Sequence, residues 1–308
     1  YVAYGKGTLH LTVIDPERFS EAEDEARADG IHQISLGPGS VGYLGIVATN
    51  STDGKNSISL LQPGDESSLE YDFSKMLLDL TKPQKKKLGL LTGLPLLGPP
   101  SGQNNSGERA RTWAILDVLK ENFTVNPIKY DISVMPDGID VLLVVHPKDL
   151  PDSTQYAIEQ FVLNGGKMIM FIDPLAEGDP TAPDPATPGV LPVLSSNPKN
   201  LLAGWGIRMT PDKVVADPET AVKVNFRTPD GLRKVIYLPW IQIRENHINR
   251  QEFSTNGLTI LNVGTAGSLE ILKGSTALAY RKLFDTPVTS GLIDSKTIIQ
   301  IGNPSELF

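Results

Sequence analysis

The segment Ile139–Pro174 constrains the fold more than any other part of the chain, because it contains two buried strands separated by a helix-length stretch. Val141–Val145 is an unbroken apolar run rich in β-branched residues, which is typical of a strand covered on both faces. Met168–Ile172 is a second apolar run, and Asp173–Pro174 ends it. A strand, a helix and a strand joined by short connections form a right-handed unit of a parallel sheet. This segment therefore predicts an α/β fold.

The helix between these strands has clear predicted ends. Asp152 follows Pro151 and is a good N-cap, and Gln155 three residues later completes a capping-box-like pair. Gly165–Gly166 is predicted to end the helix in the left-handed conformation that glycine adopts at low cost. Apolar residues at three- and four-residue spacing form one buried stripe: Ala157, Ile158, Phe161 and Val162.

Functional residues are expected where the two strands end, because ligands of parallel sheets bind outside the carboxyl ends of the strands. His146, Lys148 and Asp149 follow the first strand, and Asp173 and Glu177 follow the second. We therefore expect these five side chains to form a ligand-binding site.

The first part of the chain, residues 1–83, is predicted to be a separate α/β domain. A strand is expected at Thr8–Ile14, and a helix at Phe19–Ala28. Val41–Ala48 and Ser57–Leu61 are predicted to pair as a hairpin, and Asp65 to cap the helix that follows. This order fits the later part of a thioredoxin-like domain whose first strands are missing.

Residues 84–308 are predicted to form a second domain after the basic junction Lys82–Lys87, a solvated linker or a contact with acidic lipid. The order strand, helix, strand, strand, helix, strand is that of a flavodoxin-like or class I glutamine-amidotransferase-like parallel sheet. The Pro-rich stretch Leu175–Pro198 leaves the carboxyl edge of this sheet as a lid or an interface loop. A β-rich extension follows it, with a tight turn at Pro229–Gly231.

Composition excludes several classes of function. The net charge of −8 over 308 residues argues against a nucleic-acid surface. No apolar run approaches the roughly 20 residues that span a bilayer. Because the chain begins with Tyr1 rather than Met, we expect a piece of a longer protein, and an anchor outside its ends would not be visible in this sequence.

The residues needed for covalent catalysis are not found in a recognisable pattern. The chain contains no cysteine and no G-x-S-x-G motif. Ser196 and Ser268 lie in predicted loops without a nearby histidine pattern. We therefore expect no catalytic nucleophile, although Asp149, Asp173 and Glu177, together with Asp179, leave open a general acid–base pair.

Metal and phosphate sites are not expected either. None of the four histidines has the i, i+4 spacing that metal ligands favour on a helix. The glycine-containing loop 93–107 matches neither the dinucleotide fingerprint nor the P-loop. The sequence therefore predicts neither a metal nor another cofactor.

Several stretches resemble one family, that of the auxiliary component of an uncharacterised ABC-type transport system, which includes a gliding-motility protein of bacteroidetes. The most specific stretch is HPKDLPDSTQYAIEQFVLNGGK with the FIDP that follows it. The others are VIDPERFSEAEDEARADGI, YLGIVATNSTDGKNSISLLQP, LEYDFSKMLLDLTKPQKKKLGLLTGLPL and LLAGWGIRMTPDKVVADPETA.

The resemblance implies a membrane-anchored subunit whose large domain faces the periplasm or the cell exterior, with permease and ATPase subunits of an ABC transporter as partners. It also implies an amidotransferase-like sheet without its catalytic cysteine, and it transfers no catalytic residue. A homo-oligomer is an open alternative.

Three functions fit the sequence. The first is a non-enzymatic accessory or binding subunit of a membrane ABC transporter. The second is a degenerate amidotransferase-like enzyme that uses His146, Asp149 and Asp173 on a small metabolite or glycan. The third is a receptor for a glycan or another small ligand at the same edge of the sheet.

Overall fold

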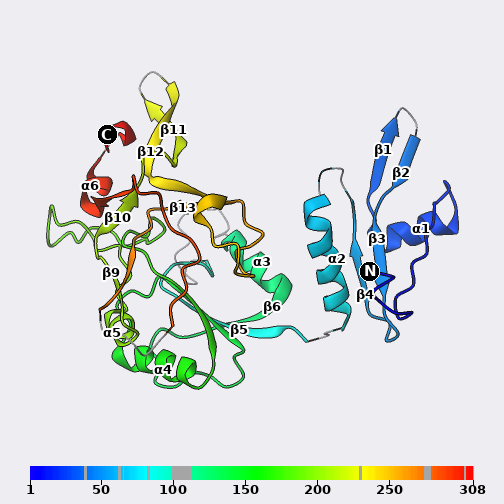
Figure 1. Cartoon of the computed structure of the whole chain (residues 1–308), viewed down its shortest axis with the longest axis horizontal. Helices are drawn as coiled ribbons and strands as arrows, with labels where there is room; N and C mark the ends of the chain where they lie inside the picture. The colour runs from blue at the N-terminus through cyan, green and yellow to red at the C-terminus, as the bar shows by residue number, and fades with distance from the viewer. Residues whose placement is uncertain are drawn as a thin grey trace. The chain divides into compact units, whose positions relative to one another are not determined.

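Figure 1 shows a computed structural model of the chain, which describes residues 1–37, 40–61, 64, 66–81, 84–98, 112–228, 231–273, 279–301 and 303–307. The chain divides into two compact units, Tyr1–Lys85 and Lys86–Phe308. Both units contain helices and strands, which confirms the predicted α/β class. Several predicted features lie outside the described residues: the cap at Asp65, the junction at Lys82–Pro83, the loop residues 99–107, residues 108–111 at the start of the helix expected over 108–122, and the turn residues Pro229–Asp230.

The first unit has the element order α1 (Glu21–Ala28), β1 (Gln33–Gly37), β2 (Ser40–Tyr43), β3 (Ile46–Thr49), β4 (Lys55–Ile58) and α2 (Glu66–Thr81). β1 pairs with β2, and β3 pairs with β4, both antiparallel. The pairing of β3 with β4 is the predicted hairpin. The likeness of this unit to a truncated thioredoxin-like domain stays a prediction.

Two expectations for the first unit were wrong. No strand forms at Thr8–Ile14, where Leu11 and Val13 are 71% and 87% exposed, because no described strand lies beside them to pair with or to cover these side chains. The single strand expected at 41–48 is instead two strands, interrupted at Leu44–Gly45. A Cβ at Gly45 would lie 2.8 Å from both Ile31 and the Ile58 carbonyl oxygen, so the interruption occurs at a close backbone approach.

The second unit is built around a parallel sheet of the described strands β5 (Lys86–Thr92), β6 (Phe123–Pro127), β7 (Val141–Val145) and β8 (Lys167–Phe171), in the order β6-β5-β7-β8. The chain enters at β5, places β6 on one side of it, and then crosses over to β7 and β8 on the other side. This order is the 2-1-3-4 arrangement with which flavodoxin-like sheets begin. The direction of winding reverses between β5 and β7.

Helices cover the two faces of this sheet. Alternate residues of β5 and β7 point to opposite faces, because side chains of a strand alternate. Leu90 and Leu143 pack with Leu116 of α3 (Ala114–Asn122) on one face. On the other face, Leu142 and Val144 of β7 pack with residues of α4 (Asp152–Leu163) and α5 (Lys199–Gly204). The sheet thus lies between helices, as the apolar runs predicted.

The ends of α4 differ in how well they follow the prediction. Gly165 has a φ of 89°, so the predicted left-handed ending is confirmed. The capping box was wrong: Pro151 occupies the N-cap position without a side-chain cap. Gln155 instead donates from Nε2 to the Leu150 carbonyl at 2.9 Å, because its amide turns back outside the first turn of the helix.

The rest of the second unit is the β-rich extension. It contains β9 (Ile207–Met209), β10 (Lys213–Ala216), β11 (Ala221–Thr228), β12 (Gly231–Arg244), η1 (Glu245–His247), β13 (Ile260–Gly264), β14 (Leu269–Ile271), β15 (Gly291–Asp294), α6 (Ser295–Gln300) and η2 (Pro304–Leu307). β12 pairs with both β11 and β13, and β10 pairs with β15, all antiparallel. Residues 172–198, between β8 and α5, form no helix or strand, as expected for the Pro-rich stretch.

Candidate functional site

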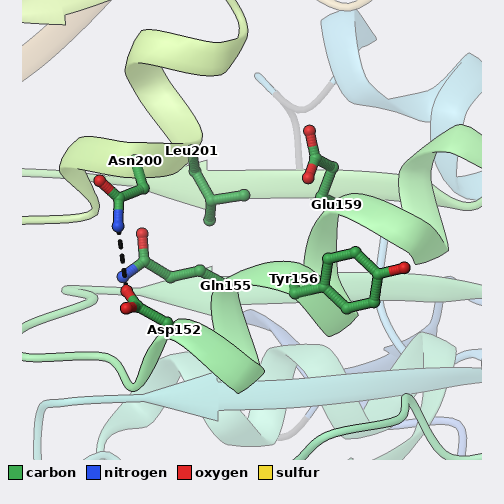
Figure 2. A pocket seen from close by; sticks show the side chains of 6 residues that line it. All are labelled: Asp152, Gln155, Tyr156, Glu159, Asn200 and Leu201. Atoms are coloured by element: carbon green, nitrogen blue, oxygen red, sulfur yellow. Dashed lines mark hydrogen bonds between the residues drawn. The ribbon is translucent and has the colours of Figure 1, made fainter.

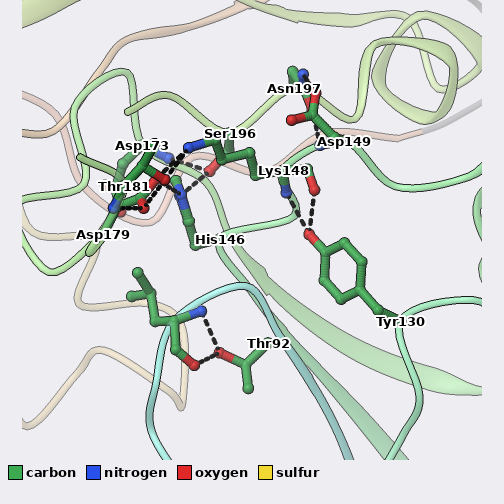
Figure 3. Close-up of polar contacts among 11 residues, drawn as sticks. Thr92, Tyr130, His146, Lys148, Asp149, Asp173, Asp179, Thr181, Ser196 and Asn197 are labelled. Atoms are coloured by element: carbon green, nitrogen blue, oxygen red, sulfur yellow. Dashed lines mark hydrogen bonds and ion pairs between the residues drawn. The ribbon is translucent and has the colours of Figure 1, made fainter. Parts of the chain in front are cut away.

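Figure 3 shows the predicted site residues His146, Lys148, Asp149 and Asp173 at the carboxyl edge of the parallel sheet, where β5 to β8 end. His146 follows β7 and is fully buried. Its backbone has a φ of 49°, and its N–H donates to the Phe171 carbonyl of β8 at 2.9 Å. A positive φ is unusual for a residue with a side chain. The turn after β7 thus directs this imidazole inward between the ends of the strands.

The His146 imidazole lies between a serine and a carboxylate. Its Nδ1 is 3.0 Å from Ser196 Oγ, and its Nε2 is 3.1 Å from Asp179 Oδ2. An ionised carboxylate only accepts hydrogen bonds, so the neutral imidazole carries its proton on Nε2. Nδ1 then accepts the hydrogen bond from the Ser196 hydroxyl. Ser196, His146 and Asp179 therefore form a continuous hydrogen-bonded chain.

Asp179 also binds Lys148 and Thr181. Lys148 Nζ is 2.7 Å from Asp179 Oδ2 and 2.8 Å from Thr181 Oγ1. Thr181 donates to Asp179 Oδ1 from its backbone N–H at 2.9 Å and from its hydroxyl at 2.6 Å. We call His146, Lys148, Asp179, Thr181 and Ser196 the His146 network. It ties the turn after β7 to two separate points of the stretch 172–198.

Burial and pairing shift the pKa values of the His146 network in definite directions. Burial lowers the pKa of His146, and the adjacent Asp179 only partly offsets this effect. Burial alone would raise the pKa of Asp179, but hydrogen bonds from Lys148, Thr181 and His146 outweigh it and hold that pKa below its ordinary value. The network therefore contains a neutral imidazole and an ion pair of Lys148 with Asp179 at neutral pH.

A second set of bonds fixes the backbone of the same turn. The Tyr130 hydroxyl donates to the Lys148 carbonyl at 2.5 Å and accepts from the Lys148 N–H at 2.6 Å. Asp149, with a φ of 52°, accepts from Asn197 Nδ2 at 2.7 Å, and its N–H donates to Asn197 Oδ1 at 2.6 Å. The Asp149 carboxylate therefore pairs with Asn197 and is not part of the His146 network.

Asp173 and Glu177, the other predicted site residues, lie differently. The Asp173 N–H donates to Ser196 Oγ at 3.1 Å. Burial, with a smaller effect of Glu177, raises the pKa of the Asp173 carboxyl to about 6. Glu177 is exposed, and its Oε1 accepts from Trp240 Nε1 of β12 at 3.0 Å. The structure thus brings His146 and Lys148 together through Asp179, places Asp173 beside Ser196, and engages Glu177 with the β-rich extension.

Between β5 and β7, where the direction of winding reverses, backbone atoms of the described residues are in close contact and leave no crevice. Gly93 follows β5, and its N–H donates to the Val145 carbonyl at 2.9 Å. A Cβ at Gly93 would come within 2.3 Å of the His146 carbonyl oxygen. Ligand crevices of such sheets form at this point, but here the chain itself occupies the space between Gly93 and His146.

Sequence reasoning missed the partners of His146. The sequence has no histidine pattern near Ser196, but the fold brings Ser196 to His146 across 50 residues. Asp179 had been noted only as one of several carboxylates. Two cavities of about 170 and 640 Å³ lie along α4, away from the His146 network. No local pattern could have found the Ser196 pairing, since Ser196 lies in a stretch without regular structure.

The fold and this edge define a parallel α/β domain with a buried polar network at the carboxyl ends of its strands. Residues 85–308 match the family model described as an ABC-type uncharacterized transport system, so the chain belongs to this family. The predicted family is confirmed, and membership makes the chain an auxiliary component of an ABC transport system. Searches among curated proteins and among solved structures gave no match.

Two further structural findings concern the described residues only. None of their helices has the length and apolar character required to cross a membrane. They contain no group of three or more His, Asp or Glu side chains placed to hold a metal ion.

Proposed function

We propose that the chain is the extracytoplasmic part of a membrane-anchored auxiliary subunit that binds other components of an ABC transporter and catalyses no reaction of its own. Its family membership supports the transporter assignment. The partners proposed are the permease and ATPase subunits. The domain between the anchors would act as a scaffold or as a binding module for them.

The proposal that the chain catalyses no reaction rests on one observation: the side chains of His146, Ser196 and Asp179 are buried and joined to one another by hydrogen bonds. His146 and Ser196 are 0% and 4% exposed, and the Asp179 side chain is 3% exposed. Each polar group of these three side chains has a partner within the chain. A reacting atom must come within hydrogen-bond reach of a general base, and here the neighbouring residues fill that space.

Co-purification tests the association. The full-length protein, tagged and expressed in its own cells, is extracted in mild detergent and captured. We expect the permease and the ATPase to be recovered with it in fixed proportion. Recovery of neither subunit, from membranes in which both are present, contradicts the proposal.

The orientation can be tested with cysteine labelling, because the 308 residues contain no cysteine. Val288 is fully exposed, so Val288→Cys introduces one reactive thiol. A membrane-impermeant maleimide should label this variant in intact cells or spheroplasts, and the parent protein reports the background. Labelling only after the membrane is permeabilised would place the domain in the cytoplasm.

A second candidate function follows from the Ser196–His146–Asp179 chain. Serine hydrolases also link a hydroxyl, an imidazole and a carboxylate by hydrogen bonds. If the stretch 172–198 moved away, the Ser196 hydroxyl could act as a nucleophile. A fluorophosphonate probe distinguishes the two functions: the scaffold function predicts no labelling, whereas labelling that Ser196→Ala abolishes identifies a hydrolase.

A further inference from the structure

The outer side of α4, facing α5, contains a small cavity that the proposed function does not use. Its volume is about 170 Å³. We call it the α4–α5 cavity, and Figure 2 shows its lining residues: Asp152, Gln155, Tyr156, Glu159, Asn200 and Leu201. Two of the six are carboxylates, and none of them is basic.

Gln155 contributes an acceptor that has no partner among the described residues. The residue is only 7% exposed, and its Nε2 donates to the Leu150 carbonyl at 2.9 Å. This bond fixes the orientation of the amide, because the opposite orientation would place two oxygens against each other. Oε1 then turns toward α5, as Figure 2 shows, and no described donor reaches it. A buried acceptor without a donor is costly, by about 1–3 kcal/mol in proteins generally, so this oxygen calls for a donor.

The charges around Gln155 specify the kind of donor. Asp152 Oδ1 accepts from Asn200 Nδ2 at 3.0 Å, and Glu159 Oε1 lies 3.8 Å from the position that a Cβ at Gly204 would take. Among the described residues, no Lys, Arg or His forms an ion pair with either carboxylate. The cavity therefore offers acceptors and negative charge and lacks a cation.

The neighbouring cavity of about 640 Å³ continues this surface on the other side of Tyr156. Asp137 and Asp140 belong to its lining, and that lining also contains no basic residue. Lys87 is nearby, with its Nζ 3.4 Å from the position of a Cβ at Gly138. The two linings together contain four carboxylates and no basic residue, with the Lys87 ammonium beside the larger cavity, and their excess of negative charge attracts a positively charged ligand.

We propose that the α4–α5 cavity binds an organic ammonium group. The ammonium donates one hydrogen bond to Gln155 Oε1, while the carboxylates of Asp152 and Glu159 balance its charge. Its alkyl chain packs on the Tyr156 ring and on Leu201. A compact ammonium has three donors and no acceptor, which suits a cavity lined by the Gln155 Oε1 acceptor and two carboxylates, where the Asn200 and Gln155 amide donors are already bonded within the chain. This inference is independent of the proposed transporter role.

Binding can be observed directly at the side-chain amide of Gln155. The ¹⁵N-labelled 308-residue chain is titrated with n-butylammonium chloride, with n-butanol and sodium chloride as matched neutral and ionic controls. We expect a saturable shift of the Gln155 Nε2–H signals with n-butylammonium only. An equal response to n-butanol would overturn the proposal, because the cavity would then be recognising apolar surface. No saturable shift would also overturn it.

Charge-neutralising variants test the role of the carboxylates. Glu159→Gln and Asp152→Asn should each weaken n-butylammonium binding by about tenfold, the effect of roughly 1.4 kcal/mol. Asp117→Asn removes an exposed carboxylate from α3 and should leave the affinity unchanged. If Glu159→Gln and Asp117→Asn bind n-butylammonium equally well, the proposed site is wrong.

The ammonium could belong to a free amine or to a lysine of a partner protein. Spermidine represents the first source, and the capped tripeptide acetyl-Gly-Lys-Gly-amide represents the second, with norleucine in place of lysine as its control. Saturable shifts of the Gln155 amide with spermidine alone indicate a free amine, and shifts with the lysine peptide alone indicate a partner side chain. Binding of the norleucine peptide as tightly as the lysine peptide contradicts the proposal. Failure of these titrations would leave the co-purification result unaffected, so the two proposals can fail separately.

Discussion

The carboxyl edge of the parallel sheet and the outer side of α4 both contain buried or half-buried polar groups, but they satisfy them in opposite ways. At the carboxyl edge, the Asp179 carboxylate receives hydrogen bonds from Lys148, Thr181 and His146. On the outer side of α4, Gln155 Oε1 has no partner, and the Glu159 carboxylate has no cation among the described residues.

This difference separates a structural role from a binding role. A polar group removed from water costs free energy unless a partner replaces the lost hydrogen bonds. Where the chain supplies the partner, as it does for Asp179, the group holds segments of the fold together. Where no described residue supplies the partner, as for Gln155 Oε1, a ligand can supply it. The carboxyl edge, where the fold type predicts a binding site, thus has its polar groups paired within the chain. The unpaired acceptor lies in the α4–α5 cavity instead.

The largest loss of stability at the carboxyl edge is expected from a substitution of Gly93. In Gly93→Ala the new Cβ would lie 2.3 Å from the His146 carbonyl oxygen, so the backbone of β5 or of the turn after β7 must shift. We expect a loss of about 4 kcal/mol in the free energy of unfolding, at the upper end for single substitutions. Urea denaturation measures it.

Gly257→Ala is the matched control for this substitution, because a Cβ there meets nothing within 4 Å. Its stability should be unchanged or slightly higher, since alanine restricts the unfolded chain. If Gly93→Ala were no less stable than Gly257→Ala, the close contact between Gly93 and His146 would not exist in solution.

Removal of the Lys148 cation from the His146 network should cause the next largest loss in the free energy of unfolding. Lys148→Met leaves the Asp179 carboxylate, only 3% exposed, without its ion pair. We expect a loss of about 3 kcal/mol at pH 7, because breaking a buried pair on one side leaves an uncompensated charge. The pKa of Asp179 is lowered in the folded protein, so this stabilisation is present above the ordinary carboxyl pKa and is lost as the pH falls below it. The deficit of the variant should therefore shrink below about pH 4.

Two comparisons sharpen this result. The double variant Lys148→Met with Asp179→Asn should recover part of the lost stability, because no buried charge remains. Lys282→Met breaks an exposed pair with Asp285 and should cost about 1 kcal/mol or less. Equal losses for Lys148→Met and Lys282→Met would show that the Lys148–Asp179 pair is no more than a surface contact.

Asp173 offers a smaller effect of the opposite sign at the same edge. Burial raises the pKa of the Asp173 carboxyl to about 6 in the folded protein, whereas in the unfolded chain the carboxyl ionises above about pH 4. Between these two pH values ionisation therefore favours the unfolded chain. The contribution of Asp173 to stability is therefore lost as the pH rises through 6. Asp173→Asn should be more stable than the parent protein by about 2 kcal/mol at pH 8 and nearly equal to it at pH 4. Denaturation at both pH values measures this, with Asp117→Asn as the control that should show no such difference.

The sequence predicted the elements that depend on local patterns. The apolar runs of β7 and β8 and the glycine ending of α4 are visible within a few residues, and the structure contains them. The exposed Thr8–Ile14 segment shows the limit of this reasoning, because weak alternation predicts a strand only if another strand pairs with it. For the same reason, the interruption at Leu44–Gly45 depends on Ile31, a residue that lies elsewhere in the sequence.

The candidate site could be predicted only by position. The rule that ligands bind at carboxyl ends identified His146 and Lys148 as neighbours, since both follow β7. It could not show that Ser196 and Asp179 would fill the space around them, because those residues lie in a stretch without regular structure. Gln155 was noticed for the wrong reason, as part of a helix cap, whereas its role depends on α5, which is distant in the sequence.

The smallest effect on stability is expected on the outer side of α4. Glu159 is half-buried and has no ion pair among the described residues, so Glu159→Gln removes a charge that stabilises nothing within the chain. The free energy of unfolding should change by less than about 0.5 kcal/mol, as for substitutions away from special contacts. Added n-butylammonium should raise the stability of the parent protein, because a ligand that binds only the folded state stabilises it. The same concentration of n-butylammonium should raise the stability of Glu159→Gln by a smaller amount. A large loss of stability in Glu159→Gln without ligand would mean that Glu159 has a structural partner, and the two regions would then not differ in the way proposed.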